Sequence, residues 1–231
     1  MINDIQVIAF DADDTLWINE LYFREAEQKF CRHLELYYPH NIISKELFQT
    51  EMANLNLYGF GIKSFILSMI ETATRIAGQE NLSSIIEETI RIGKDLLQKP
   101  IELLYGVEPL LDALSGKYKL VLATKGDLLD QQRKLQKSKL EKFFHHIEIM
   151  SDKQEENYRK LISYLNIAPN HFLMVGDSLK SDIIPVLNIG GKAIHVPHHT
   201  NWDYETVNHK TDHYNFQTVE NILQVLEFIK I

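Results

Sequence analysis

Asp11-Ala12-Asp13-Asp14-Thr15 directly follows the apolar run Ile5–Phe10 near the start of this 231-residue chain. A short apolar run of this kind is typical of a buried β-strand, and in open α/β sheets ligands bind where the strands end. Asp11 and Asp13 are two residues apart, so on an extended segment they share a face. Adjacent carboxylates repel each other unless a cation or a shared proton relieves them. The stretch predicts a metal or acid–base site, with an ordinary polar turn as the alternative.

The composition indicates a globular protein with enough length for one large core or a core plus a smaller domain. Hydrophobic residues make up 45% of the chain, and the formal net charge is −8. This acidic balance argues against nucleic acid and anionic membranes as partners. It does not exclude an anionic substrate, because a bound divalent cation can reverse the local field.

Cysteine usage and the N-terminus predict the compartment. Cys31 is the only cysteine, so no disulfide can form within the chain, which fits a reducing compartment. The first residues lack the basic and apolar regions of a signal peptide, and no uncharged apolar run reaches membrane-spanning length. We expect a cytoplasmic protein, either a monomer or a homodimer.

Residues 18–99 show only helical patterns. Apolar residues recur there at helical spacing, and Gly78 provides a stop signal between two segments. The predicted helices are Glu20–Tyr38, a helix with Ser44 as its N-cap that runs through Leu57, Ile62–Ala77 and Ser83–Leu97.

From Pro100 onward, predicted strands alternate with predicted helices. The strands are Lys119–Ala123, Ile147–Met150, Phe172–Val175 and Ala193–Val196. The helices are Val107–Leu114, Leu128–Lys137, Gln154–Leu165, Leu179–Leu187 and a last one over Val219–Ile229. This alternation predicts an α/β fold, a parallel sheet with helices on both faces.

The first strand needs a sheet to join, and the later strands provide one. We therefore expect an α/β core domain of residues 1–17 and 100–231, with residues 18–99 inserted as a helical cap that acts as a lid. Two independent domains are the alternative, which would leave the first strand unpaired.

Polar residues follow three further predicted strands. Thr124 and Lys125 could hold a phosphate, and Gly126 would let the backbone approach it. Asp177 follows a strand that ends in Gly176, and an oxygen-rich set of Asp11, Asp13 and Asp177 suits a hard cation such as Mg²⁺. The other candidates are Lys153, after the strand Ile147–Met150, and Asp182, one helical turn beyond Asp177.

Taken in order, these motifs resemble the haloacid dehalogenase-like (HAD) hydrolase superfamily over essentially the whole chain. They are Asp-x-Asp-x-Thr at 11–15, the strand that ends in Thr124, then Lys153, then Gly-Asp-x-x-x-x-Asp at 176–182. Helices inserted after the first motif are most similar to its phosphatase branch.

The resemblance implies a role for each matching residue. Asp11 would be the nucleophile, and Asp13 the general acid and then the base. Thr124 and Lys153 would hold the phosphoryl oxygens. Mg²⁺ would bind Asp11, Asp177 and the backbone carbonyl of Asp13, while Asp182 would orient a metal-bound water or Lys153.

Three departures from the family pattern bear on these roles. Asp14 stands where Gly is common and adds a third local carboxylate. Lys125 follows Thr124 where Asn is frequent, so it is an alternative phosphate cation to Lys153. Gln154 follows Lys153 where many relatives have Pro.

We expect a phosphatase that acts on a small phosphorylated metabolite. Dehalogenases of the superfamily lack the second acid, which Asp13 supplies here. Sugar phosphomutases share all of these residues, so they stay open as an alternative. The alternative from a different functional class is a phospho-accepting signalling domain. Such a domain is about half the length of this chain and has no helical insertion.

Two further segments lie outside the motifs. In the cap, the loop Tyr58–Lys63 combines aromatics, glycines and a lysine, and we expect Phe60 and Lys63 to select the substrate, with a plain helix–helix turn as the alternative. The histidine-rich segment His195–Trp202 is predicted to be a loop beside the pocket rather than a zinc site.

Overall fold

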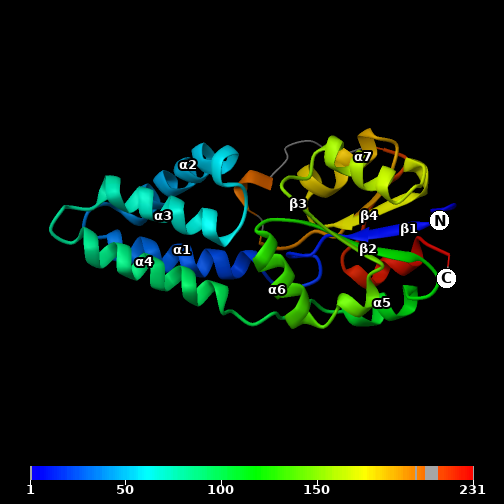
Figure 1. The fold of residues 1–231 in the computed structure, drawn as a ribbon, viewed down its shortest axis with the longest axis horizontal. Helices are drawn as coiled ribbons and strands as arrows, with labels where there is room; N and C mark the ends of the chain where they lie inside the picture. Colours follow the sequence, from blue (N-terminus) through cyan, green and yellow to red (C-terminus); the bar gives the residue numbers. More distant parts are fainter. Residues whose placement is uncertain (1, 201, 206–212, 231) are drawn as a thin grey trace. The chain divides into compact units, whose positions relative to one another are not determined.

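The computed structural model describes residues 2–200, 202–205 and 213–230. The chain divides into two compact units (Figure 1). The sheet unit comprises Met1–Glu20, Ile101–Lys125 and Gln131–Ile231. The helical unit comprises Leu21–Pro100 and Gly126–Asp130. The short segment after Lys125 thus belongs to the helical unit.

In the sheet unit, the described strands form one six-stranded parallel sheet in the order β3-β2-β1-β4-β5-β6. The strands are β1 (Val7–Phe10), β2 (Lys119–Lys125), β3 (His146–Met150), β4 (Phe172–Gly176), β5 (Lys192–His195) and β6 (Phe216–Thr218). β1 lies in the middle of the sheet, with β2 and β3 on one side and β4, β5 and β6 on the other. The chain thus adds strands first on one side of β1 and then on the other, and ligands bind where the strand order reverses in this way.

The two faces of the sheet bury alternate residues of the same strand. Ile8 and Phe10 join an apolar cluster with α5 (Val107–Leu114), whereas Val7 and Ala9 join a cluster with α7 (Glu155–Tyr164). Figure 1 shows α5 and α7 on opposite sides of the sheet. Strands buried on both faces read as continuous apolar runs. The predicted α/β class with helices on both faces is therefore confirmed.

Two predicted helices of the sheet unit differ in the structure. The last helix, predicted over Val219–Ile229, is wrong: a 3₁₀ segment (η5, Ile222–Glu227) replaces it, and Val219 N–H donates to the His195 carbonyl at 2.9 Å, which extends the pairing of β6. β6 itself has three residues, too few for a recognisable pattern. The helix predicted over Leu179–Leu187 is a π-helical turn (η3, Leu179–Ile183) followed by α8 (Ile184–Asn188).

The remaining helical elements of the sheet unit connect the strands. They are α6 (Leu128–Ser138), whose first residues belong to the helical unit, and the short 3₁₀ segments η1 (Glu141–Phe143), η2 (Pro169–His171) and η4 (Asp203–Glu205).

The helical unit contains α1 (Glu20–Leu34), α2 (His40–Tyr58), α3 (Ile62–Ile76) and α4 (Leu82–Leu97). The predicted N-cap Ser44 is wrong, because α2 begins four residues earlier, after Pro39. Ser44 lies inside the helix, where its hydroxyl donates to Glu27 at 2.5 Å. In the part of the chain that the structure describes, no helix has the length and apolarity needed to cross a membrane.

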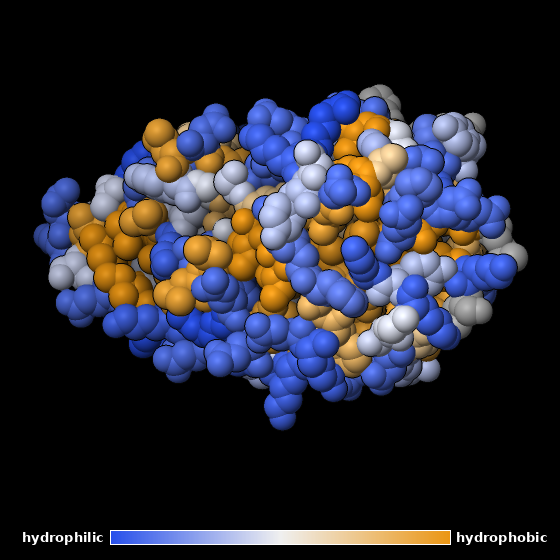
Figure 2. All heavy atoms as spheres, turned by 45° about the vertical axis from the view of Figure 1, so that its right-hand side comes forward, coloured by the Kyte–Doolittle hydropathy of each residue, from blue (hydrophilic) through white to orange (hydrophobic). Residues whose placement is uncertain are grey.

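Hydrophilic residues cover much of the face in Figure 2, and hydrophobic ones emerge between them. The most exposed large apolar residues lie on separate elements: Leu36, Leu57, Tyr105, Tyr164 and Tyr214. Scattered apolar residues of this kind are normal on protein surfaces and do not by themselves indicate a partner.

Candidate active site

The site lies at the carboxyl ends of the three central strands of the sheet unit. Phe10 of β1 pairs with Leu122 of β2 and with Val175 of β4. The N–H of Asp11 donates to the Val175 carbonyl at 2.9 Å, so the pairing continues to the residue at which the strand ends. Because the strands are parallel and in register, Asp11, Thr124 and Asp177 all lie at the carboxyl end of the sheet. Thr124 is buried there.

Three carboxylates converge at this edge. Asp11, Asp177 and Asp182 each offer an oxygen, and these oxygens lie within 4.8 Å of one another. Gly176 permits this approach, because a Cβ at its position would lie 2.4 Å from Cγ of Asp182. Hard divalent cations such as Mg²⁺ prefer carboxylate oxygens, so the donor set fits such an ion.

The electrostatics of these carboxylates favour a bound cation. Burial raises the pKa of Asp11 to about 7, with the charges of Asp182 and Asp13 adding to the effect and Lys153 opposing it. Burial and the neighbouring Asp11 and Asp182 raise the pKa of Asp177 well above its ordinary value. A cation among these groups would relieve the repulsion.

Lys153 is buried among the carboxylates. Its Nζ contacts Oδ1 of Asp11 and lies 2.6 Å from Oδ1 of Asp182. Burial alone would lower the pKa of Lys153, but Asp11 and Asp182 hold it well above its ordinary value. The Tyr158 hydroxyl donates to the Ser181 carbonyl at 3.0 Å and fixes the wall of this pocket. The structure thus brings Lys153 to the predicted nucleophile.

Lys125 has different partners. Its Nζ donates to the Ser181 hydroxyl at 2.7 Å and pairs with Glu205. Glu205 also accepts hydrogen bonds from the Ser178 and Ser181 hydroxyls. Burial alone would raise the pKa of Glu205, but Lys125 and the serines hold it below its ordinary value. Sequence reasoning missed Glu205, which lies 80 residues beyond Lys125 in the chain.

The first motif loop is held by its own side chains. The backbone N–H of Asp177 donates to the Thr15 hydroxyl at 3.0 Å, which ties the loop to β4. Asp14 has a φ of 60°, a conformation that Asp tolerates. Its carboxylate accepts the N–H groups of Asn19 and Glu20 at 2.9 Å and so caps the start of α1. Burial raises the pKa of Asp14 to about 6.

Asp13 is bound by side chains that sequence reasoning missed: Trp17, Gln131 and Lys134. Gln131 and Lys134 lie three residues apart on α6, which follows the Thr124 motif. Their helical spacing puts them on a shared face one turn apart, but nothing in the sequence marks that face as buried.

The predicted selectivity residues lie in the helical unit. Phe60 and Lys63 occupy the turn between α2 and α3 and the start of α3. Lys63 pairs with Asp127 at 3.0 Å. Gly61 has a φ of +110°, and a Cβ there would lie 3.0 Å from the backbone nitrogen of Asp127. This turn therefore packs directly on the segment that follows the Thr124 motif.

The histidine-rich segment contacts the motif loops. The His195 Nε2 is 2.8 Å from the Asp177 carbonyl oxygen, and His198 Nδ1 lies 3.6 Å from Asp14 Oδ1. Among the described residues, no histidine of this segment joins a group of three metal-ligating side chains.

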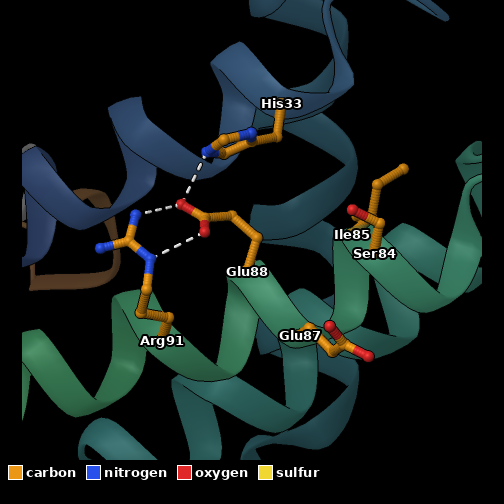
Figure 3. Close-up of a pocket in the computed structure, with 6 residues that line it drawn as sticks. All are labelled: His33, Ser84, Ile85, Glu87, Glu88 and Arg91. Atoms are coloured by element: carbon orange, nitrogen blue, oxygen red, sulfur yellow. Dashed lines mark hydrogen bonds and ion pairs between the residues drawn. The ribbon is translucent and has the colours of Figure 1, made fainter.

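A hollow of about 330 Å³ lies between α1 and α4 of the helical unit (Figure 3). His33 and Arg91 both contact Glu88 in it, as the dashed lines in Figure 3 mark. The basic side chains that line this hollow thus already contact Glu88, and the convergent carboxylates of the sheet unit are the stronger candidate site.

Comparison with known proteins agrees with this geometry. A family model described as haloacid dehalogenase-like hydrolase matches residues 5–190. The chain belongs to this family. A haloacid dehalogenase-like family hydrolase from Xanthomonas campestris is 35% identical, with a TM-score of 0.82 over 94% of this chain and 87% of that one.

Two further HAD relatives differ in their named reactions. N-acylneuraminate-9-phosphatase of Rattus norvegicus is 23% identical over 203 residues, which are 83% of this chain and 82% of the relative. A 2-haloacid dehalogenase from Pseudomonas syringae is 16% identical, with a TM-score of 0.60 over 96% of this chain and 97% of that one. Because the HAD fold serves both named reactions, the reaction must be argued from the site.

The raised pKa of Asp11 predicts a pH-dependent stability. The folded chain keeps a proton on Asp11 up to about pH 7, whereas the unfolded chain loses it near the ordinary value of 3.8. This contribution to stability is lost as the pH rises through that range. The free energy of unfolding of Asp11→Asn should therefore rise by about 2 kcal/mol relative to that of the wild type between pH 5 and pH 8. Urea unfolding in the presence of a chelator measures the difference.

The matched control for this measurement is Asp112→Asn on α5, whose carboxylate is exposed. The free energies of unfolding of this control and of the wild type should differ by the same amount throughout the pH range. Parallel plots of the free energy of unfolding against pH for Asp11→Asn and the wild type would contradict the prediction.

Proposed function

We propose that this protein is a magnesium-dependent phosphatase that hydrolyses a small phosphate monoester through an aspartyl-phosphate on Asp11. The observation that carries the proposal is the second carboxylate, Asp13, two residues beyond Asp11 and hydrogen-bonded in place. A halide leaves without a proton, whereas an alkoxide needs a general acid. The name of the rat relative, a phosphatase, points the same way.

In the proposed first step, a carboxylate oxygen of Asp11 attacks phosphorus and the bond from phosphorus to the ester oxygen breaks. Asp13 donates a proton to the departing oxygen. In the second step, water attacks phosphorus, Asp13 takes its proton, and the phosphorus–Asp11 bond breaks to release phosphate. Dividing one displacement into two lowers each barrier.

An anionic nucleophile can approach an anionic ester only if charge is offset. Lys153, which contacts Asp11 in the folded chain, is proposed to bind the phosphoryl oxygens together with Thr124. Asp11, Asp177 and the Asp13 carbonyl are proposed to hold Mg²⁺, with Asp182 orienting Lys153 or a metal-bound water. The ion would supply further charge neutralisation at the phosphoryl group.

We infer that Lys153 rather than Lys125 is the main phosphate cation. Lys153 lies against the nucleophile, whereas Lys125 is paired with Glu205 and the Ser181 hydroxyl. The criterion is position: the phosphoryl group must reach Asp11, and Lys153 Nζ contacts Asp11 directly.

The substrate class is proposed to be a small phosphorylated metabolite, selected by the helical unit acting as a cap. Phosphorylated sugars that carry a carboxylate belong in the first screen because of the rat relative's name. We place the protein in the cytoplasm, because its single cysteine, Cys31, allows no disulfide within the chain, which fits a reducing compartment.

Release of phosphate from 4-nitrophenyl phosphate tests the reaction. The wild type should turn over with Mg²⁺ and stop when chelator is added, and Asp11→Asn should lower kcat about 1,000-fold or more because no covalent step remains. Asp112→Asn, on the exposed face of α5, should match the wild type. Equal turnover by Asp11→Asn would disprove the nucleophile. Phosphate appearing only on an added acceptor would indicate a phosphotransferase.

The two lysines can be separated by replacing each with Met. Lys153→Met should lower kcat/KM about 100-fold or more, since it removes charge stabilisation at the phosphoryl group. Lys125→Met should cost about 10-fold or less, because Lys125 contacts Glu205 and the Ser181 hydroxyl rather than the nucleophile. Thermal unfolding of both variants controls for folding, and Lys153→Arg keeps the charge if Lys153→Met is unstable. A larger loss for Lys125→Met would reverse the assignment.

Selection by the cap is tested with a panel of phosphate esters. Phe60→Ala and Lys63→Ala should change the ratio of kcat/KM values between esters by about 10-fold, because one or two lost contacts are worth about 1–3 kcal/mol. Leu57→Ala and Lys45→Ala, at exposed positions of the adjacent α2, are the controls. An unchanged ranking of esters in the Phe60 and Lys63 variants would exclude these two residues as selectors.

A further inference from the structure

The carboxylate of Asp13 is held by three side chains, which we call the Asp13 clamp: Trp17, Gln131 and Lys134. Trp17 Nε1 donates to Oδ1 at 2.7 Å, and Gln131 Nε2 donates to Oδ2 at 2.8 Å. Lys134 Nζ lies 2.9 Å from Oδ1 and 3.0 Å from Oδ2. Each oxygen thus has two donors, which together fix the orientation of the carboxylate.

Lys134 is held in this position because it is buried. It lies one turn after Gln131 on α6 and is buried, and its Nζ also donates to Asn19 Oδ1 at 2.7 Å. A buried ammonium is costly unless it is paired, and the carboxylate of Asp13 supplies that partner. Asp13 and Lys134 therefore hold each other in place.

Gln131 supplies independent evidence. Its amide nitrogen donates to Asp13 Oδ2 and, at 3.1 Å, to the Lys125 carbonyl. Both neighbours are acceptors, so the NH₂ group must face them. The amide oxygen is buried, and in the described part of the chain it accepts no hydrogen bond.

A buried acceptor without a hydrogen bond destabilises the folded chain, and such groups in folded proteins require an explanation. Packing alone does not supply one at position 131, because an apolar side chain there would avoid the cost. What Gln131 provides instead is a pair of donors that join Asp13 to the end of β2.

We propose that Gln131 and Lys134 are positioning residues that hold Asp13 in the orientation needed for proton transfer. The proposal rests on the proposed function, in which Asp13 gives its proton to the leaving oxygen and later takes one from water. Gln131 and Lys134 keep their own protons and act only through Asp13. Positioning of this kind is worth large factors, because a misplaced acid transfers its proton poorly.

The leaving group distinguishes this role from general support of the fold. An alkoxide needs its proton at the moment of departure, whereas 4-nitrophenoxide leaves with little help. Lys134→Met should lower kcat/KM about 100-fold for an alkyl phosphate and about 10-fold or less for 4-nitrophenyl phosphate. Gln131→Leu should change the two esters in the same unequal way. Lys134→Arg should recover part of the loss.

The matched control is Lys137→Met, an exposed lysine one turn further along α6, which should leave both esters unchanged. Equal losses for both esters in Lys134→Met would overturn the proposal, because they would indicate a role unconnected with the general acid.

A double-mutant cycle provides the second readout. Because the clamp acts through Asp13, Asp13→Asn/Lys134→Met should be no slower on the alkyl ester than Asp13→Asn alone. Losses that multiply would assign Lys134 an independent role and overturn the proposal. Thermal unfolding identifies variants that fail to fold. If Lys134→Met is one of them, the two esters are compared with Gln131→Leu and Lys134→Arg instead.

The experiments distinguish an outcome that overturns only the proposed role of the Asp13 clamp from one that overturns the proposed function. No phosphate release by the wild type from any ester would overturn the phosphatase and the clamp together. Turnover that is lost in Asp11→Asn and Asp13→Asn but unchanged in Lys134→Met would overturn the clamp alone.

Discussion

The site depends on one constraint, which is that several carboxylates and an ammonium group are buried together at the carboxyl end of the sheet. Asp11, Asp177 and Asp182 lie within reach of one ion, and Lys153 is the ammonium buried among them. Burial raises the pKa of both Asp11 and Asp177. Carboxylates so close together repel each other, and a bound cation would relieve that repulsion.

Local structure around these charges follows from that constraint. Gly176 has no side chain because Asp182 fills the space where a Cβ would be. The π-helical turn after β4 returns Asp182 to the strand end, where Ser178 N–H donates to its carboxylate at 3.1 Å. Thr15 ties the first loop to the backbone of Asp177. Backbone donors and one absent Cβ thus fix the carboxylates in place.

Much of the fold could be predicted from the sequence because its signals are local. The apolar run before Asp11 and the alternation of strands and helices indicate a parallel sheet, and parallel strands bring their carboxyl ends to one edge. β6 and the 3₁₀ segment after it could not be predicted. The three residues of β6 carry no periodicity, and η5 begins after Asn221, whose side chain accepts the N–H of Leu223.

The partners of the site residues were beyond the reach of sequence patterns for a related reason. Glu205 meets Lys125, and Lys134 meets Asp13, across separations of 80 and 121 residues. Charged residues are common on helix surfaces, and nothing local marks Lys134 as buried or Glu205 as paired. Only the tertiary fold decides which of many lysines and glutamates turn inward.

The central place of β1 has a consequence for how the chain acquires its structure. Val7 pairs with Lys119 on one side and with Phe172 on the other, so β1 has no neighbour until β2 is made and lacks the second until β4 is made. The helices between them depend mainly on contacts close in sequence, which form early, whereas distant strand pairing is slow. During synthesis, Val7–Phe10 would therefore stand as an unpaired apolar strand ahead of an already helical segment, and strands left unpaired in this way are prone to aggregation.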